Sequence, residues 1–155
     1  MPNKILAALD NSVMSKSVFE EALSLAKATA AHLRLLHVVP PDEETAQDYP
    51  IYLTDLKPYL SKSESNLTLV RHPFITYTNQ SLTAGIQTEF FQYLGNPGQI
   101  ICNFALIWES DLIVIGRQEA LDLHRLVLGS VSYHVVHHAP CSVHIVNYPR
   151  CMRSI

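Results

Sequence analysis

Short hydrophobic runs alternate with longer amphipathic segments along the 155-residue chain. The run Lys4–Leu9 stops at a polar Asp-Asn-Ser sequence, as a strand buried on both faces of a parallel sheet does. Residues 15–32 place hydrophobic side chains at steps of three and four, which predicts an amphipathic helix of about five turns. The next hydrophobic run, residues 33–39, ends at two prolines and predicts a second strand. A strand, helix and strand in this order form a right-handed crossover with parallel strands.

The predicted helix at residues 15–32 carries Ser17 and Glu20 near its start, spaced as in a capping box. The hydrophobic face expected to pack on the sheet holds Val18, Ala22, Leu25, Ala26 and Ala30.

The second half of the chain repeats the same alternation. Residues 86–94 are rich in aromatic and β-forming side chains and precede a Gly-Asn-Pro-Gly turn signal, so they predict a third strand. A helical hydrophobic stripe follows, and residues 111–116 give the strongest signal of a buried strand. A helix from Gly129 to about His138 and a fifth strand at residues 141–146 complete the pattern. Alternating strands and helices predict one α/β domain with an open parallel sheet, covering residues 1–155.

Residues 41–84 show little clean periodicity after an acidic beginning. They predict a variable insert within the single domain: a loop or lid, followed by an irregular helix broken near Pro73.

Charge and cysteine content narrow the possible partners and compartment. The chain is 48% hydrophobic and 16% charged, with a formal net charge of −3, and its eleven Lys and Arg residues are scattered. This distribution argues against nucleic acid as a partner. The N-terminal hydrophobic run is too short for a signal peptide or a membrane span, so no membrane association is expected. Three cysteines, Cys102, Cys141 and Cys151, form no CxxC motif and favour a reducing compartment, so we expect a cytoplasmic protein.

Ligands of open parallel sheets bind outside the carboxyl ends of the strands. Asp10 follows the first predicted strand, where its carboxylate could accept hydrogen bonds from a ribose or a base edge. The alternative is that Asp10 caps the following helix together with Asn11 and Ser12. Gly116 ends a later strand, and its missing side chain would allow a ligand to approach the backbone closely or allow a positive φ. A glycine at this position is equally typical of a simple turn.

The last predicted helix opens at Gly129 and Ser130, and its free N–H groups would suit an anion. His134 and His138 lie one helical turn apart, and such a pair can bind zinc or copper. Because no cysteine or carboxylate completes a recognisable ligand set, structural or surface histidines are favoured and no metal site is expected. The sequence contains neither a Gly-x-Ser-x-Gly elbow nor a P-loop, so no catalytic residue is assigned.

Several stretches together resemble the universal stress protein family. They are KILAALDNS at the start, LLHVVPP in the second strand, DLIVIGR in the fourth, and LGSVSYHVVHHAPCSVHIV at the end. The resemblance covers roughly the first 40 and the last 45 residues. It implies a Rossmann-like fold of the adenine nucleotide alpha-hydrolase type, with strand order 3-2-1-4-5. It also implies a homodimer that pairs the last strands, here from Cys141 to Val146, and an exposed hydrophobic edge strand favours such pairing.

Nucleotide-binding members of this family carry two glycines three positions apart, then nine residues, then Gly-Ser or Gly-Thr. The pattern selects Gly116, position 119, Gly129 and Ser130, but position 119 is Glu. The resemblance implies that Asp10 contacts the ribose or adenine, that the Val38 backbone meets the adenine edge, and that Gly116 passes beside the nucleotide. It further implies that the N–H groups of Ser130, Val131 and Ser132 take the phosphates of ATP or AMP, with Mg²⁺, and that the two serine hydroxyls assist.

Glu119 opposes that role because it places a negative charge beside the phosphates. Two like charges 4 Å apart repel by about 4 kcal/mol at an effective dielectric constant of about 20. Arg117, His124 and Arg125 could offset the repulsion, and AMP would suffer less than ATP.

The sequence is therefore consistent with three functions. The first is a non-catalytic adenine-nucleotide sensor in stress response that presents a surface to a protein partner of unknown identity. The second is a dimeric stress protein that binds no nucleotide because of Glu119. The third, and least favoured, is a weak hydrolase.

Overall fold

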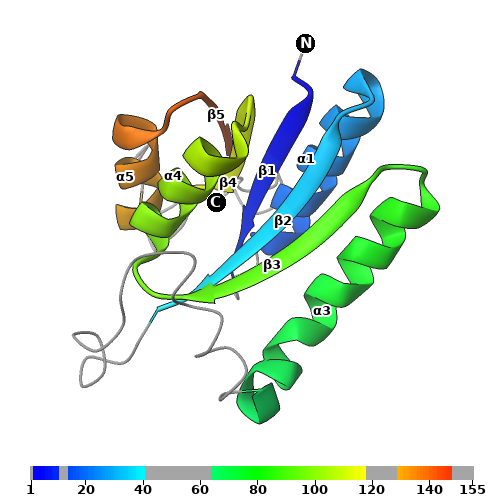
Figure 1. Ribbon diagram of the computed structural model, residues 1–155, viewed down its shortest axis with the longest axis horizontal. Helices are drawn as coiled ribbons and strands as arrows, with labels where there is room; N and C mark the ends of the chain where they lie inside the picture. The colour runs from blue at the N-terminus through cyan, green and yellow to red at the C-terminus, as the bar shows by residue number, and fades with distance from the viewer. Residues whose placement is uncertain (1, 11–13, 41–63, 118–128, 148–155) are drawn as a thin grey trace, which may run out of the picture.

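The structure is a computed structural model that describes residues 2–10, 14–40, 64–117 and 129–147, with the backbone alone over residues 64–73. In these residues, five parallel strands form one sheet in the order β3-β2-β1-β4-β5 (Figure 1). The predicted parallel sheet and strand order are therefore confirmed. The strands are β1 (Lys4–Leu9), β2 (His32–Val39), β3 (Thr88–Leu94), β4 (Leu112–Gly116) and β5 (Ser142–Val146).

Helices cover both faces of the sheet (Figure 1). The core on one face is built by the helices α1 and α3, and the core on the other face by α4 and α5. Each buried strand therefore needs hydrophobic residues on both sides, which explains its nearly continuous hydrophobic sequence. The helices are α1 (Ser15–Thr29), α3 (Glu64–Thr83), α4 (Pro97–Trp108) and α5 (Ser130–His138). Among the described residues, no helix has the length and apolar character needed to cross a membrane.

Helix α1 begins at Ser15 as predicted, but it corrects the prediction of its C-terminal end and of its cap. It is shorter than the predicted 15–32, because Ala30 adopts a left-handed conformation with φ 54° and donates its N–H to the Ala26 carbonyl. Its N-cap is Met14, without a side-chain cap. The predicted capping box of Ser17 and Glu20 is therefore wrong, because both residues already lie inside the helix. The predicted buried face omitted two side chains, Phe19 and Leu23, and included the exposed Ala30.

Helix α3 shows that the predicted break near Pro73 is also wrong, because the helix is continuous from Glu64 to Thr83. A proline inside a helix removes one backbone hydrogen bond and costs about 3 kcal/mol. The next residue, Phe74, is only 1% exposed. Its ring centroid lies 4.6 Å from that of His37 and 5.6 Å from that of Phe90. We attribute the continuity of the helix to this packing. The remainder of the predicted insert, residues 41–63, lies outside the described residues.

Candidate functional site

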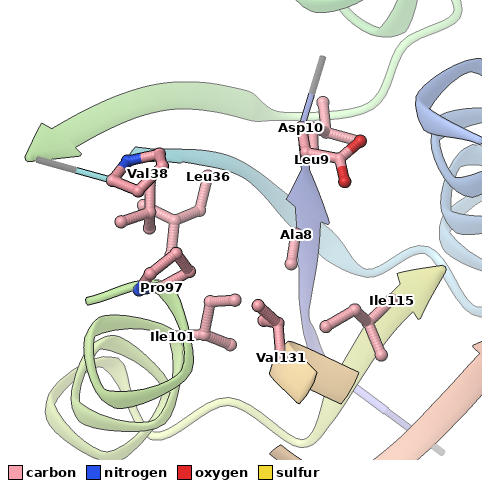
Figure 2. Close-up of a pocket in the computed structure, with 10 residues that line it drawn as sticks. Ala8, Leu9, Asp10, Leu36, Val38, Pro97, Ile101, Ile115 and Val131 are labelled. Carbon is pink, nitrogen blue, oxygen red and sulfur yellow. The ribbon is translucent and has the colours of Figure 1, made fainter. Parts of the chain in front are cut away.

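A cavity of about 190 Å³ opens at the carboxyl ends of β1 and β2, on the face covered by α4 and α5 (Figure 2). This is the edge of the sheet at which the sequence predicts a ligand. Nine of the ten lining side chains are hydrophobic, and Asp10 is the exception. The lining residues are Ala8, Leu9, Asp10, Leu36, Val38, Pro40, Pro97, Ile101, Ile115 and Val131.

The floor of the cavity is a row of three residues across the sheet. Ala8 of β1 is in register with Leu36 of β2 on one side and with Ile115 of β4 on the other. The central alanine is the smallest of the three, and the space above its methyl group is not filled by the neighbouring strands. Small central and larger flanking side chains therefore create the hollow.

The walls come from two helices and from the end of β2. Pro97 and Ile101 lie on the first turns of α4, and Val131 lies on the first turn of α5. Figure 2 shows Val38 above Pro97 and Ile101, with Val131 facing Ile115 across the opening. A cavity with this lining suits a largely apolar group. Val38, Val131 and Asp10 were all predicted from the sequence as site residues, and the structure brings them to one cavity.

Asp10 lies just beyond the tip of β1 (Figure 2). Its backbone N–H donates to the Ser15 hydroxyl oxygen at 2.8 Å. The Ser15 hydroxyl group in turn donates to the backbone carbonyl of Asp10 and lies 3.1 Å from the Asp10 Oδ1 atom, a second acceptor. Met14, and not Asp10, occupies the N-cap position of α1. Asn11 and Ser12, which the predicted capping alternative also includes, lie outside the described residues. Ser15, which the sequence analysis did not select, therefore helps to hold the Asp10 backbone at the cavity.

The start of α5 lies beside the cavity, and its N-cap residue supplies no side-chain cap. Its N-cap is Gly129, with an extended backbone at φ −67° and ψ 168°. The first-turn N–H groups of Ser130, Val131 and Ser132 have no acceptor within the helix, as at every helix N-terminus. Ser130 is exposed, and Val131 is partly buried against the cavity. This end of the helix can therefore receive an anion.

Ser132 differs from Ser130 because its side chain is turned into the protein and is fully buried. Its hydroxyl oxygen lies 3.2 Å from the Gly129 carbonyl oxygen and 3.5 Å from that of Arg117. Both oxygens only accept, so the single hydroxyl proton of Ser132 is used within the protein. The Ser132 hydroxyl is therefore not available to donate to a ligand.

Arg117 joins three elements at the end of β4. Its N–H donates to the Val146 carbonyl at 3.2 Å, and its own carbonyl accepts from the Gly129 N–H at 3.1 Å. The side chain is 4% exposed, with Nη1 3.4 Å from the Asn147 side-chain oxygen. Arg117 therefore fixes the start of α5 relative to the ends of β4 and β5.

Gly116 does not have the positive φ considered from the sequence. A Cβ atom at this position would lie 3.1 Å from Val18 Cγ2 and 3.3 Å from Met14 Cβ. Both contacts are tighter than ordinary van der Waals packing. The missing side chain of Gly116 thus makes room for α1.

His37, which the sequence analysis did not select, lies on the opposite face of the same sheet edge. It is 2% exposed, and its Nδ1 accepts from the Gln92 side-chain amide at 2.9 Å. Burial lowers the pKa of His37 to about 4, although the Asp10 carboxylate acts in the opposite direction. His37 is therefore neutral near pH 7. Its position in a continuous hydrophobic run was the available signal that it would be buried.

Several predicted features fall outside the described residues, namely Glu119, His124 and Arg125. Among the described residues, no group of three or more His, Cys, Asp or Glu side chains could hold a metal ion. The structure therefore describes the apolar cavity and the start of α5. Residues 118–128, which connect β4 to α5, lie outside the described residues.

Comparison with known proteins gives the family. The model of the universal stress protein family matches residues 1–147. A universal stress protein of Synechocystis, Sll1388, is 31% identical over 153 residues, covering 94% of this chain and 97% of that protein. The chain belongs to the universal stress protein family.

Solved structures of universal stress proteins share the fold of this chain. The universal stress protein UspA of Lactobacillus plantarum is 27% identical, with a TM-score of 0.71, covering 93% of this chain and 97% of its own. A universal stress protein family protein of Arabidopsis thaliana, solved with AMP bound, is 22% identical, with a TM-score of 0.68, covering 97% of this chain and 95% of its own.

Proposed function

We propose that this chain is a non-catalytic adenine-nucleotide-binding module whose base-binding site is the cavity around Ala8. The observation that carries the proposal is the position of an apolar cavity directly beside a helix N-terminus whose N-cap residue, Gly129, has no capping side chain. A nucleotide has the matching two-part chemistry, with a flat base at one end and an anionic phosphate at the other. The AMP bound to the Arabidopsis relative supports this ligand class.

The two helices that border the cavity determine the direction of the ligand. At the start of α4, Pro97 has no N–H, and the Gln99 N–H already donates to the Asn96 side chain at 3.2 Å. At the start of α5, the N-cap Gly129 has no side chain to take the corresponding donors. The phosphate is therefore placed at α5, and the base at Val38 and the start of α4.

Asp10 is the ionisable residue of the cavity lining and is placed at its rim. In the proposed complex its carboxylate accepts hydrogen bonds from the ribose hydroxyls or the base edge. Hydrolysis needs a base positioned on the attacking water, and Asp10 is the one described lining residue that can act as a base. A binding role is therefore favoured over turnover.

The test is calorimetric titration of nucleotide-stripped protein with AMP, ADP and ATP, each with and without Mg²⁺, and with UMP as the base control. Saturable AMP binding at micromolar concentrations, with weaker binding of UMP, is the expected result. No binding of any adenine nucleotide would support the alternative of a dimeric stress protein without a nucleotide.

The variant Glu119→Gly separates the two functions further. If the carboxylate at position 119 repels the phosphates, this change should increase the affinity for ATP more than that for AMP, because ATP carries more charge. Equal affinities before and after the change would mean that position 119 does not face the ligand.

The module would act by presenting a ligand-dependent surface to a protein partner. Ligand would order residues 118–128, between Arg117 and the start of α5. Hydrogen exchange of this segment should slow when AMP is added, and unchanged exchange would contradict the sensor role.

We further propose that the chain forms a homodimer through β5. Within the described residues β5 pairs only with β4, so its outer edge is open to a second copy of the chain. Light scattering across a concentration series should give twice the chain mass. A monomer at all concentrations would overturn the proposed dimer.

A further inference from the structure

Two histidine rings lie together on α5, on the side where His134 contacts Gly98 of α4. His134 and His138 are one helical turn apart, with ring centroids 4.2 Å apart and an interplanar angle of 18°. His134 is partly buried and His138 is exposed, so solvent and ions reach the pair. The imidazole groups are therefore stacked on a rigid element rather than on a loop, and a rotation about their side-chain bonds would turn a nitrogen of each ring towards one ion.

The hydrogen bond of His138 defines its tautomer. Its Nδ1 lies 2.9 Å from the backbone carbonyl oxygen of His134. A carbonyl oxygen only accepts hydrogen bonds, so Nδ1 carries the proton. In the neutral ring, the lone pair is then on Nε2. Metal-binding histidines commonly show this arrangement, in which one nitrogen donates to a carbonyl and the other is available to the metal.

The position of His134 is fixed by the neighbouring helix. A Cβ atom added to Gly98 of α4 would lie 2.8 Å from His134 Cδ2 and 2.9 Å from its Cγ. The imidazole thus occupies the space left by the missing side chain of Gly98. This packing restricts the ring and reduces the entropy that a metal ion would otherwise have to overcome.

The helices α4 and α5 carry no charged residue that could pair with His134 or His138. Neither α4 nor α5 contains a Lys, Arg, Asp or Glu residue. The adjacent His137 packs against Tyr133 instead, with ring centroids 4.3 Å apart. The His134–His138 pair is therefore a distinct two-imidazole group.

We propose that His134 and His138 together bind a divalent transition-metal ion, most tightly Cu²⁺. Imidazole suits Cu²⁺, Ni²⁺ and Zn²⁺, and the order of affinities among divalent ions places Cu²⁺ first and predicts little binding of Mg²⁺. Two protein ligands leave the other coordination positions to water or to a partner molecule. The sequence favours structural histidines because no third ligand is apparent in it. A site with two histidine ligands and open coordination positions does not need a third protein ligand.

The first experiment is a titration of nucleotide-stripped, full-length chain with Cu²⁺, because free nucleotides would themselves chelate the metal. His134→Asn and His138→Asn should each weaken the tightest Cu²⁺ site by more than about tenfold, the lower bound seen for losing even a supporting group. The matched control is His137→Asn, which should retain the wild-type affinity. Asn and His have similar helix propensities, so α5 is preserved. Equal Cu²⁺ binding by all four proteins, or an equal loss in the control, would overturn the proposal.

Gly98→Ala provides a second test that leaves both ligands in place. The added methyl group would displace the His134 ring and should weaken Cu²⁺ binding while circular dichroism shows a folded chain. The electron paramagnetic resonance spectrum of the wild-type complex should show coupling of Cu²⁺ to two imidazole nitrogens. A spectrum with one nitrogen, unchanged in His138→Asn, would contradict the paired site.

Discussion

The two faces of the sheet differ at the carboxyl ends of the strands: one face has a cavity there, and the other is covered by packed side chains. On the face of α4 and α5, Ala8, Leu36 and Ile115 leave a cavity of about 190 Å³. On the face of α1 and α3, the neighbouring strand residues are covered. His37 packs against the Phe74 ring, and Met14 and Val18 of α1 lie over Gly116.

The difference follows from the two-residue period of a strand. Neighbouring residues of one strand point to opposite faces, so Ala8 contributes to the cavity and Ala7 to the closed core. A ligand can enter on one face without loosening the other. The closed face should therefore determine stability, and the open face should determine binding.

The largest effect is expected from His37 on the closed face. An unfolded histidine titrates near pH 6.5, whereas burial lowers the pKa of folded His37 to about 4. The unfolded chain therefore binds more protons between these values, and the folded state loses stability as pH falls through this window. The expected loss from this group is about 3 kcal/mol.

His37→Asn should test this expectation, because the Asn side-chain oxygen can replace Nδ1 as the acceptor for Gln92 without titrating. Urea unfolding at several pH values would show a shallower pH dependence for the variant than for the wild type between pH 6.5 and 4. Identical pH dependences would show that His37 does not remain neutral in the folded chain.

The second prediction compares two neighbouring alanines of β1. Ala7→Leu adds volume to a closed core and should destabilise the fold by about 1–3 kcal/mol. Ala8→Leu places the same side chain in the cavity, so it should cost less stability and abolish AMP binding. Urea unfolding and AMP titration of both variants provide the measurements. Loss of AMP binding in Ala7→Leu alone would reverse the proposed roles of the two faces.

The smallest expected effect concerns the cap of α5. Gly129→Ser would add a side-chain oxygen that accepts a first-turn N–H group, which should stabilise the fold by a few tenths of a kcal/mol. The same oxygen would compete with the phosphate, so AMP affinity should fall. Gly129→Ala adds bulk without an acceptor and serves as the control. An equal change in affinity in both variants would indicate steric blocking rather than competition for the N–H groups.

The strands were predictable because each is buried on both faces and therefore nearly continuous in hydrophobic sequence. The C-terminal end of α1 could not be predicted from the sequence, because it depends on the left-handed conformation of Ala30. The continuity of α3 through Pro73 could not be predicted locally, since it accompanies burial of Phe74 against residues of two strands.

The candidate site was predictable in part. The strand-end rule and the family resemblance selected Asp10, Val38 and Val131, which all line the cavity. They did not select the floor, because Ala8, Leu36 and Ile115 meet only through the register of three strands. Nor could they show that the Ser132 hydroxyl points inward, because a side-chain direction depends on its acceptors at the end of β4.

The contact of Gly116 with α1 has an evolutionary consequence. A side chain at this position would press against Met14 and Val18 whether or not a ligand is present. A descendant that lost nucleotide binding would therefore still be selected to retain this glycine.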